Sequence, residues 1–200
     1  QETLVSLAND TGFMLPPGEY TLKFLARENR LGKLGTFETK FVVPDVTTVT
    51  GVLRTSSVVF SNQREAMKSA VGSASRQQRL LAANPLVENE QKLVPSITRV
   101  FRRNQNLYVY AEVYDTGLDT ADRKPSLLTA LAFYRGRRKA FESAPVRVTE
   151  PAARRPGVIP VQFQVPLEKL APGEYTCQLS LIDEIGKRFA FPRASVVLLP

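Results

Sequence analysis

Hydrophobic and polar residues alternate in short segments along most of the chain, a pattern that predicts β-strands rather than helices. Near the start, strands are expected at residues 3–7, 19–27 and 35–43. In the second of these, one face carries Tyr20, Leu22, Phe24 and Ala26, and the other carries Thr21, Lys23 and Arg27. Three strands cannot cover their own apolar face. We therefore expect residues 1–48 to form a partial β unit, either the tail of a larger unit or an element docked on the rest.

Short strands separated by turn residues resume after residue 93 and continue to the end of the chain. They are expected at 97–101, 107–114, 126–134, 139–142, 146–149, 158–165, 174–182 and 189–199. Several short strands at such regular spacing are typical of a β-sandwich. The fold class that we predict is all-β, with an immunoglobulin-like antiparallel β-sandwich over residues 93–200.

The segment between these regions, residues 49–92, has a mixed character. Residues 50–60 predict an opening strand. Asn62 and Glu65 then resemble a capping arrangement at the start of a helix. The residues that follow form an apolar stripe, made of Ala66, Met67, Ala70 and Val71, and Gly72 ends it. We expect residues 61–92 to be an insertion or linker with a short helix, of a length that is often functional or mobile.

One motif occurs twice, as LPPGEYT at residues 15–21 and as LAPGEYT at residues 170–176. Each copy runs into a strand, a charged turn with glycine and a second strand, which is how the last hairpin of an immunoglobulin-like domain is built. A tyrosine at this corner uses its hydroxyl to bond to upstream backbone. We assign Tyr20 and Tyr175 this structural role rather than a ligand contact.

The composition restricts the chemistry that this chain can perform. It contains no histidine and a single cysteine, Cys177, whose strand neighbours predict that it is buried. Ser-His and Cys-His pairs and the usual zinc sites therefore cannot be built. Asp183 and Glu184 share a turn and Glu112 stands isolated on a strand, so no pair of carboxylates suits glycoside hydrolysis. We expect no enzyme activity, no cofactor and no metal site.

A loop with Asp115, Asp119 and Asp122 presents three carboxylates, but it lacks the spacing of a calcium-binding loop. We interpret it as an ordinary polar loop.

The net charge of +8 and the isoelectric point near 9.8 make acidic partners plausible. The densest basic run contains Arg135, Arg137, Arg138 and Lys139. These side chains could bind phosphate, sulfate or uronate groups, or could simply keep a hairpin tip soluble. Aromatic platforms and a recognition helix are not evident, so we expect no nucleic-acid partner.

Neither a membrane span nor an export leader is evident in the sequence. No apolar run approaches the roughly 20 residues of a spanning helix. Any export signal is expected to have been removed or to lie outside this chain.

Three tyrosines, Tyr108, Tyr110 and Tyr114, share one face of the strand at 107–114. Tyrosines give a large contact area at a small entropy cost, which suits interfaces. The next strand is apolar on both faces, so the sheet needs cover. Either the N-terminal hairpin or residues 61–92 would pack over the tyrosines, or an external protein partner would use them.

Several strings resemble bacterial secreted proteins related to von Willebrand factor A. They are KFLAREN at 23–29, GTFET at 35–39, TRVF at 98–101, QNLYVY at 105–110, QFQVP at 162–166 and FPR at 191–193. In such proteins these stretches lie C-terminal to the A-type domain. The resemblance implies a bacterial, extracytoplasmic, non-catalytic region of a larger polypeptide. The metal-binding Asp-x-Ser-x-Ser string of the A-type domain does not occur here, so the adhesion site is not carried over to any residue.

The expected function is therefore non-enzymatic. The region would contact a protein or the cell envelope, or would space a neighbouring domain. The alternative is a carbohydrate- or polyanion-binding module that uses the basic turn at Arg135 to Lys139. The sequence identifies neither the partner nor the oligomeric state.

Overall fold

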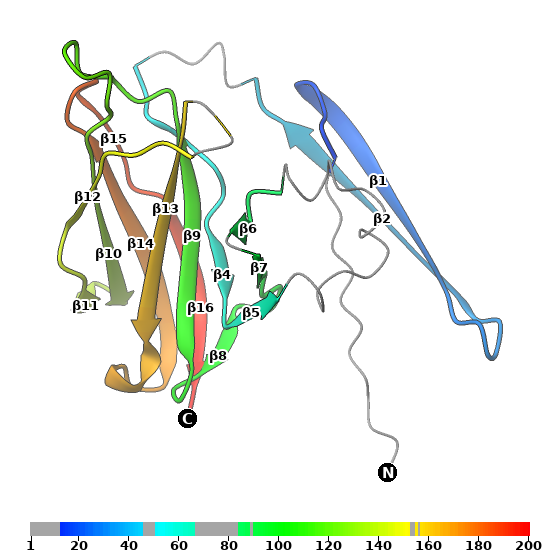
Figure 1. Ribbon diagram of the computed structural model, residues 1–200. Helices are drawn as coiled ribbons and strands as arrows, with labels where there is room; N and C mark the ends of the chain where they lie inside the picture. Colours follow the sequence, from blue (N-terminus) through cyan, green and yellow to red (C-terminus); the bar gives the residue numbers. More distant parts are fainter. Residues whose placement is uncertain (1–12, 46–50, 67–83, 89, 153–154, 156) are drawn as a thin grey trace. The chain divides into compact units, whose positions relative to one another are not determined.

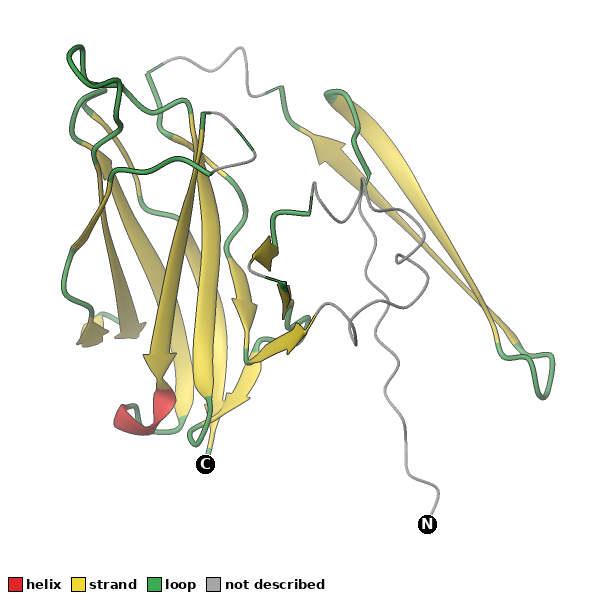
Figure 2. Ribbon diagram, viewed as in Figure 1, coloured by secondary structure: helices red, strands yellow, loops and turns green. Residues whose placement is uncertain are grey.

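The computed structural model describes residues 13–45, 51–66, 84–88, 90–152, 155 and 157–200. The chain divides into two compact units, Gln1–Thr50 and Gly51–Pro200. Both are built from β-strands, and the described residues contain no α-helix, only the 3-10 turn Leu167–Lys169 (Figures 1 and 2). None of the described helices is long and apolar enough to cross a membrane.

The first unit contains one hairpin, formed by β1 (Gly18–Arg27) and β2 (Leu34–Val43). The strands pair antiparallel along their whole length, with Tyr20 opposite Phe41. Alternation separates the two faces, because successive side chains of a strand point to opposite sides. Lys23 and Glu38 form an ion pair at 3.1 Å on one face, and aromatic and aliphatic side chains occupy the other. The strand expected at residues 3–7 lies outside the described residues.

The second unit contains two larger sheets. One has the order β11-β10-β14-β16-β8, with β12 added to β10 and β15 to β14. Its strands are β8 (Val100–Arg102), β10 (Leu127–Arg135), β11 (Arg138–Glu142), β12 (Val146–Val148), β14 (Gly173–Asp183), β15 (Arg188–Ala190) and β16 (Arg193–Leu199). All of its pairs are antiparallel except β8 with β16, which is parallel.

The other sheet has the order β13-β9-β3, with β4 also paired to β9. Its strands are β3 (Arg54–Thr55), β4 (Val59–Ser61), β9 (Asn106–Tyr114) and β13 (Val158–Pro166). A third, small sheet consists of β5 (Gln63–Ala66), β7 (Gln91–Val94) and β6 (Val87–Glu88), in the spatial order β5-β7-β6.

One apolar core is shared by the inner faces of the two larger sheets. On β9 the predicted inner residues Leu107, Val109, Ala111 and Val113 are each at most 2% exposed. They meet inner residues of β10, β14 and β16 such as Phe133, whose ring lies edge-on to Tyr175 at 6.3 Å. Each fully buried Leu, Val or Phe side chain contributes about 1.5–3 kcal/mol, so this core dominates the stability of the unit.

The two repeated tyrosines close the corners in the way that the sequence predicts. The hydroxyl of Tyr175 donates to the carbonyl oxygen of Ala171 at 2.8 Å. The hydroxyl of Tyr20 donates to the carbonyl oxygen of Pro16 at 2.9 Å, and in both pairs the carbonyl lies four residues before the tyrosine. Both bonds pin the segment that enters the strand.

The helix start predicted at Asn62 is wrong. Residues 63–66 form β5, whose backbone pairs with β7 from Gln63 opposite Val94 to Ala66 opposite Gln91. This ladder satisfies backbone groups that a helix would otherwise bond, so tertiary pairing overrides the local capping signal. Residues 67–72, which would have continued the helix, lie outside the described residues. The single strand expected at 50–60 is also divided into β3 and β4. Both pair with β9, but the register shifts by one residue between them, from Thr55 opposite Val113 to Val59 opposite Tyr110.

Candidate functional site

The outer face of β9 carries a buried polar cluster centred on Glu112. Strand alternation places Tyr110 and Tyr114 on either side of it, on the same face. The Glu112 carboxylate accepts hydrogen bonds from Tyr110 at 2.7 Å and from Tyr114 at 2.9 Å. Arg155 reaches the same carboxylate from the segment before β13 and forms an ion pair with it. Glu112 is only 5% exposed, so these partners take the place of the water that its carboxylate would otherwise bind.

The electrostatics of this cluster favour a fixed protonation pattern. Burial, and then the hydrogen bond to Glu112, raise the pKa of Tyr110 and of Tyr114 well above the usual value. Burial alone would lower the pKa of Arg155, but its bonds to Tyr110 and Glu112 outweigh this and raise it. Both phenols therefore stay protonated and the guanidinium stays charged. The cluster works as a clamp that ties Arg155 to β9.

The sequence described Glu112 as isolated from other carboxylates. In the structure its partners are of another kind, because two tyrosines and an arginine use both of its oxygens. The alternation of β9 is a sufficient signal to group the two tyrosines with Glu112. Arg155 lies in the loop before the next strand of the sheet, where no local pattern marks it.

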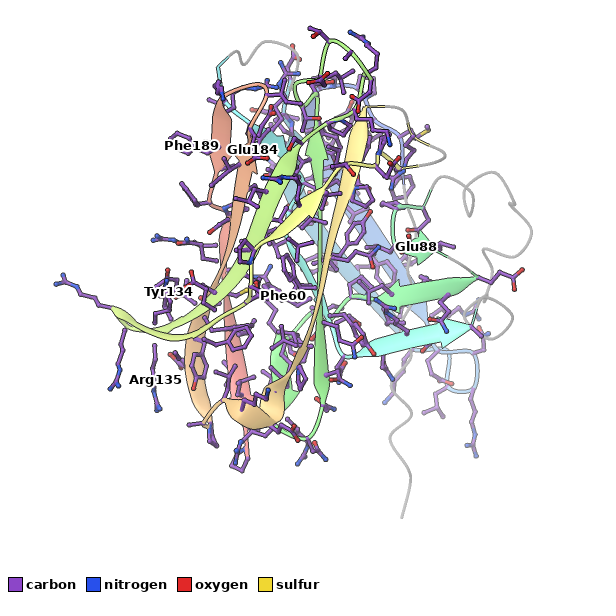
Figure 3. All side chains as sticks on the ribbon, turned by 60° about the vertical axis from the view of Figure 1, so that its left-hand side comes forward. Phe60, Glu88, Tyr134, Arg135, Glu184 and Phe189 are labelled. Atoms are coloured by element: carbon purple, nitrogen blue, oxygen red, sulfur yellow. The ribbon has the colours of Figure 1, made fainter. Side chains whose placement is uncertain are left out.

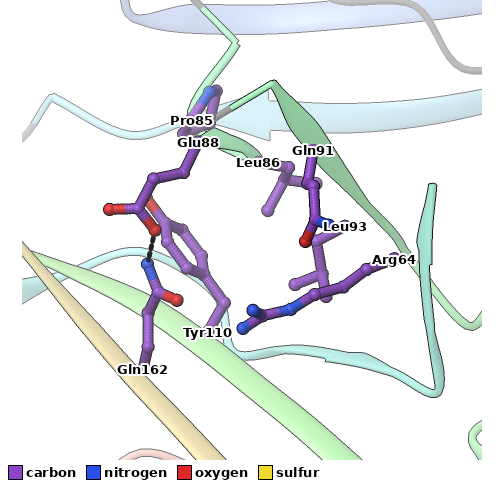
Figure 4. Close-up of a pocket in the computed structure, with 8 residues that line it drawn as sticks. All are labelled: Arg64, Pro85, Leu86, Glu88, Gln91, Leu93, Tyr110 and Gln162. Carbon is purple, nitrogen blue, oxygen red and sulfur yellow. Dashed lines mark hydrogen bonds between the residues drawn. The ribbon is translucent and has the colours of Figure 1, made fainter. Parts of the chain in front are cut away.

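Beside this cluster lies a small pocket between the third sheet and the outer face of β9 (Figure 4). It is lined by Arg64, Pro85, Leu86, Glu88, Gln91, Leu93, Tyr110 and Gln162. The side chain of Gln162 on β13 donates to Glu88 on β6 at 2.5 Å. The volume is about 70 Å³, which is well below the roughly 300–1,000 Å³ of ordinary small-molecule sites. It has room for a few water molecules.

The third sheet also covers part of the tyrosine face. The guanidinium of Arg64 on β5 lies 4.4 Å from the ring centroid of Tyr108, a cation–π contact. Tyr110 is 5% exposed, and Tyr108 and Tyr114 are half-buried. The sequence left open whether the N-terminal hairpin, residues 61–92 or an external partner covers the tyrosine face. The described part of residues 61–92 covers part of it. Tyr110 is therefore covered, whereas Tyr108 and Tyr114 each keep part of their surface exposed.

The basic turn lies at the tip of the β10–β11 hairpin, on a different side of the unit from Glu88 (Figure 3). Arg135, Arg137, Arg138 and Lys139 are all exposed. Lys139 pairs with Glu142 at 2.8 Å. The guanidinium of Arg135 lies against Gly173, where an added Cβ would come within 2.9 Å of it. Of the four, Arg137 and Arg138 have no hydrogen bond or ion pair with other described side chains.

A second buried carboxylate, Asp183, holds two loops together. It accepts hydrogen bonds from the amides of Gly117 at 2.9 Å and Gly186 at 2.8 Å, and from Arg188 at 3.0 Å. The two loops approach so closely that a Cβ on either glycine would clash with the neighbouring backbone or with Asp183. Burial alone would raise the pKa of Asp183, but the bonds from the two amides and from Arg188 lower it below 3.8.

The predicted acidic loop has its carboxylates engaged within the protein. Asp115 pairs with Arg54 at 2.9 Å. Asp119 and Asp122 accept hydrogen bonds from amides of their own loop, those of Ala121 and Lys124. Within the described part of the chain, no group of three or more potential ligands is placed to hold a metal ion.

No protein-family model matches the chain, and no curated protein matches it. The likeness to proteins related to von Willebrand factor A therefore rests on the strings quoted above.

Proposed function

We propose that residues 51–200 form an immunoglobulin-like β-sandwich that serves as a non-enzymatic interaction or spacing module. The carrying observation is the order of strands in its two larger sheets. In one sheet the neighbouring strands β10, β14 and β16 fit strands C, F and G of an immunoglobulin domain. In the other, β3 and β4, then β9, then β13 fit strands A, B and E. The shared core between the two sheets and the tyrosine corner before β14 support the same assignment.

The hallmarks of antibody domains are absent from this sequence. There is no tryptophan to pack in the core, and Cys177 is the one cysteine of the chain. Cys177 stands two residues after Tyr175, where the second cysteine of the inter-sheet disulfide would lie. Its thiol is 2% exposed, and burial raises its pKa to about 12. It acts as a small core side chain, so the domain is held by apolar packing.

The buried charged groups support a non-enzymatic role. Glu112 and Asp183 both have their oxygens occupied by donors from the protein itself. A general acid or base must reach a substrate proton within hydrogen-bond distance, whereas Glu112 is 5% exposed and Asp183 is 0% exposed. Both carboxylates are used to hold loops.

The cellular context that we propose follows from the resemblance. The region would lie outside the cytoplasm of a bacterium, in a polypeptide related to von Willebrand factor A, and would contact a protein or the cell envelope. The experiment is a sedimentation assay in which labelled chain is titrated onto purified bacterial envelope fragments. Saturable binding is expected. A bound fraction that stays at background over the titration would contradict the interaction role and leave only spacing.

The basic turn favours a second candidate, binding of acidic glycans. Arg137 and Arg138 are exposed, and other described side chains do not neutralise them. Elution from a heparin column should then need less salt after R137Q/R138Q. The control R27Q/R102Q removes the same charge from exposed positions elsewhere. Equal shifts in the two variants would show that net charge alone causes retention.

A further inference from the structure

The β1–β2 hairpin repeats the β14–β16 hairpin in three dimensions as well as in sequence. The strands begin in the same register, with Gly18 opposite Val43 and Gly173 opposite Leu198. The tyrosines face equivalent positions, Phe41 for Tyr20 and Val196 for Tyr175. The turns also agree, because Glu28 accepts from the amide three residues on, as Asp183 does. The first unit therefore contains the last hairpin of a domain like the second unit.

The two hairpins differ sharply in how much of their apolar face is covered. On β14, the inner residues Tyr175, Cys177, Leu179 and Leu181 are exposed by 4%, 2%, 1% and 0%. At the equivalent positions of β1, Leu22 is 39% exposed and Phe24 is 51% exposed. Phe37, opposite Phe24, is 61% exposed. A face that is a closed core in one copy is open in the other.

The edges of the hairpin differ in the same way. β14 pairs with β10 on one side and β16 on the other. Among the described residues, β1 pairs with β2 alone. An unpaired strand edge presents free N–H and C=O groups that another strand can bond. Within the described part of the first unit, β1 therefore has neither a counterpart of β10 nor a covering sheet.

The chemistry and size of the open face define its occupant. Its charged residues, including the pair Lys23–Glu38, lie on the opposite face, so the occupant must be apolar and uncharged. Two strands of ten residues present a face of roughly 33 by 10 Å, or about 300 Å². A stable interface takes about 800 Å² per partner. A second copy laid face to face would bury too little.

We propose that β1 and β2 close a second sandwich domain whose other strands come from polypeptide outside residues 1–200. That polypeptide supplies an antiparallel sheet with an aliphatic, uncharged inner face, together with a strand for the free edge of β1. The chain then joins two domains of the same kind in series. This inference rests on the repeat, and it stands or falls independently of any binding to the cell envelope.

The test measures thiol labelling at single cysteines introduced on the hairpin. F24C and A26C report the apolar face, and A26C keeps the test valid if F24C weakens the hairpin. K23C on the polar face is the matched control. Cys177 gives a low background because it is buried and burial raises its pKa to about 12. Each variant is labelled in the 200-residue chain and in the polypeptide that the complete reading frame encodes.

All three variants should label at similar rates in the 200-residue chain. In the complete polypeptide, F24C and A26C should label at least tenfold more slowly while K23C is unchanged. Equal rates in both proteins would overturn the proposal, as would a reading frame that supplies no further strands. Protection of F24C and A26C already in the 200-residue chain would also overturn it. Relief of that protection on dilution would identify a second copy as the cover, and its persistence would identify the second unit.

Discussion

Replacing Glu112 with glutamine tests whether the charge of this side chain, and not only its shape, stabilises the outer face of β9. The variant keeps the volume of the side chain but loses the ion pair with Arg155 and two charge-assisted bonds. Breaking a fully buried pair costs about 3–5 kcal/mol. The side chain of Arg155 is 29% exposed and can regain water, so we expect a loss of about 2 kcal/mol. For a unit of this size that lowers the melting temperature by about 4–8 °C.

The assay is urea denaturation followed by circular dichroism, with R155M and the double variant E112Q/R155M completing a cycle. The coupling free energy between the two side chains should be about 1 kcal/mol or more, since residues in one network are not additive. R155K keeps the charge but loses the planar fork, and it should recover only part of the stability. If E112Q changes the free energy of unfolding by less than about 0.5 kcal/mol, as surface substitutions do, and the coupling is zero, the clamp is refuted.

Three further predictions concern groups with defined bonds. Y175F should cost the second unit about 1 kcal/mol, a typical net value for one hydrogen bond, while Y20F should leave its main unfolding transition in place; equal effects in calorimetry would contradict this. The pKa values of Tyr110 and Tyr114 are raised in the folded protein, so the stabilisation by these phenols is present below about pH 10 and is lost as pH rises further. The melting temperature should therefore fall at alkaline pH. A melting temperature that stays unchanged up to pH 12 would count against the buried phenols. The pKa of Asp183 is lowered on folding, so its contribution to the free energy of unfolding is present above about pH 4 and is lost as pH falls through the folded value. D183N should be less stable than the wild type at pH 7, and its free energy of unfolding should fall less steeply as the pH is lowered below about 4. An equally steep fall in the two proteins would contradict this role of Asp183.

Patterns that are local in the chain predicted most of the strands. The inner row Leu107, Val109, Ala111 and Val113 follows from alternation alone, because a strand buries every second residue against a core. The corner of Tyr175 follows from a seven-residue motif whose partner carbonyl lies four residues upstream. Such features need no knowledge of the rest of the fold.

Features that depend on distant segments could not be predicted in this way. Arg155 reaches Glu112 across 43 residues of chain, and nothing near either residue indicates the pairing. Gly117 and Gly186 look like ordinary turn residues until two loops meet over Asp183. At Asn62 a local capping signal lost to a ladder with β7, formed by residues almost thirty positions later.

The central claim is that residues 51–200 form two facing sheets in the strand order of an immunoglobulin domain. The parallel pair of β8 and β16 tests it most directly, because a simple run of antiparallel hairpins would not create it. In a nuclear Overhauser experiment, backbone protons around Phe101 and Leu198 should show the contacts of parallel neighbours, in register with Val100 opposite Val197. An antiparallel pattern, or no contact between residues 100–102 and 197–199, would contradict the proposed architecture.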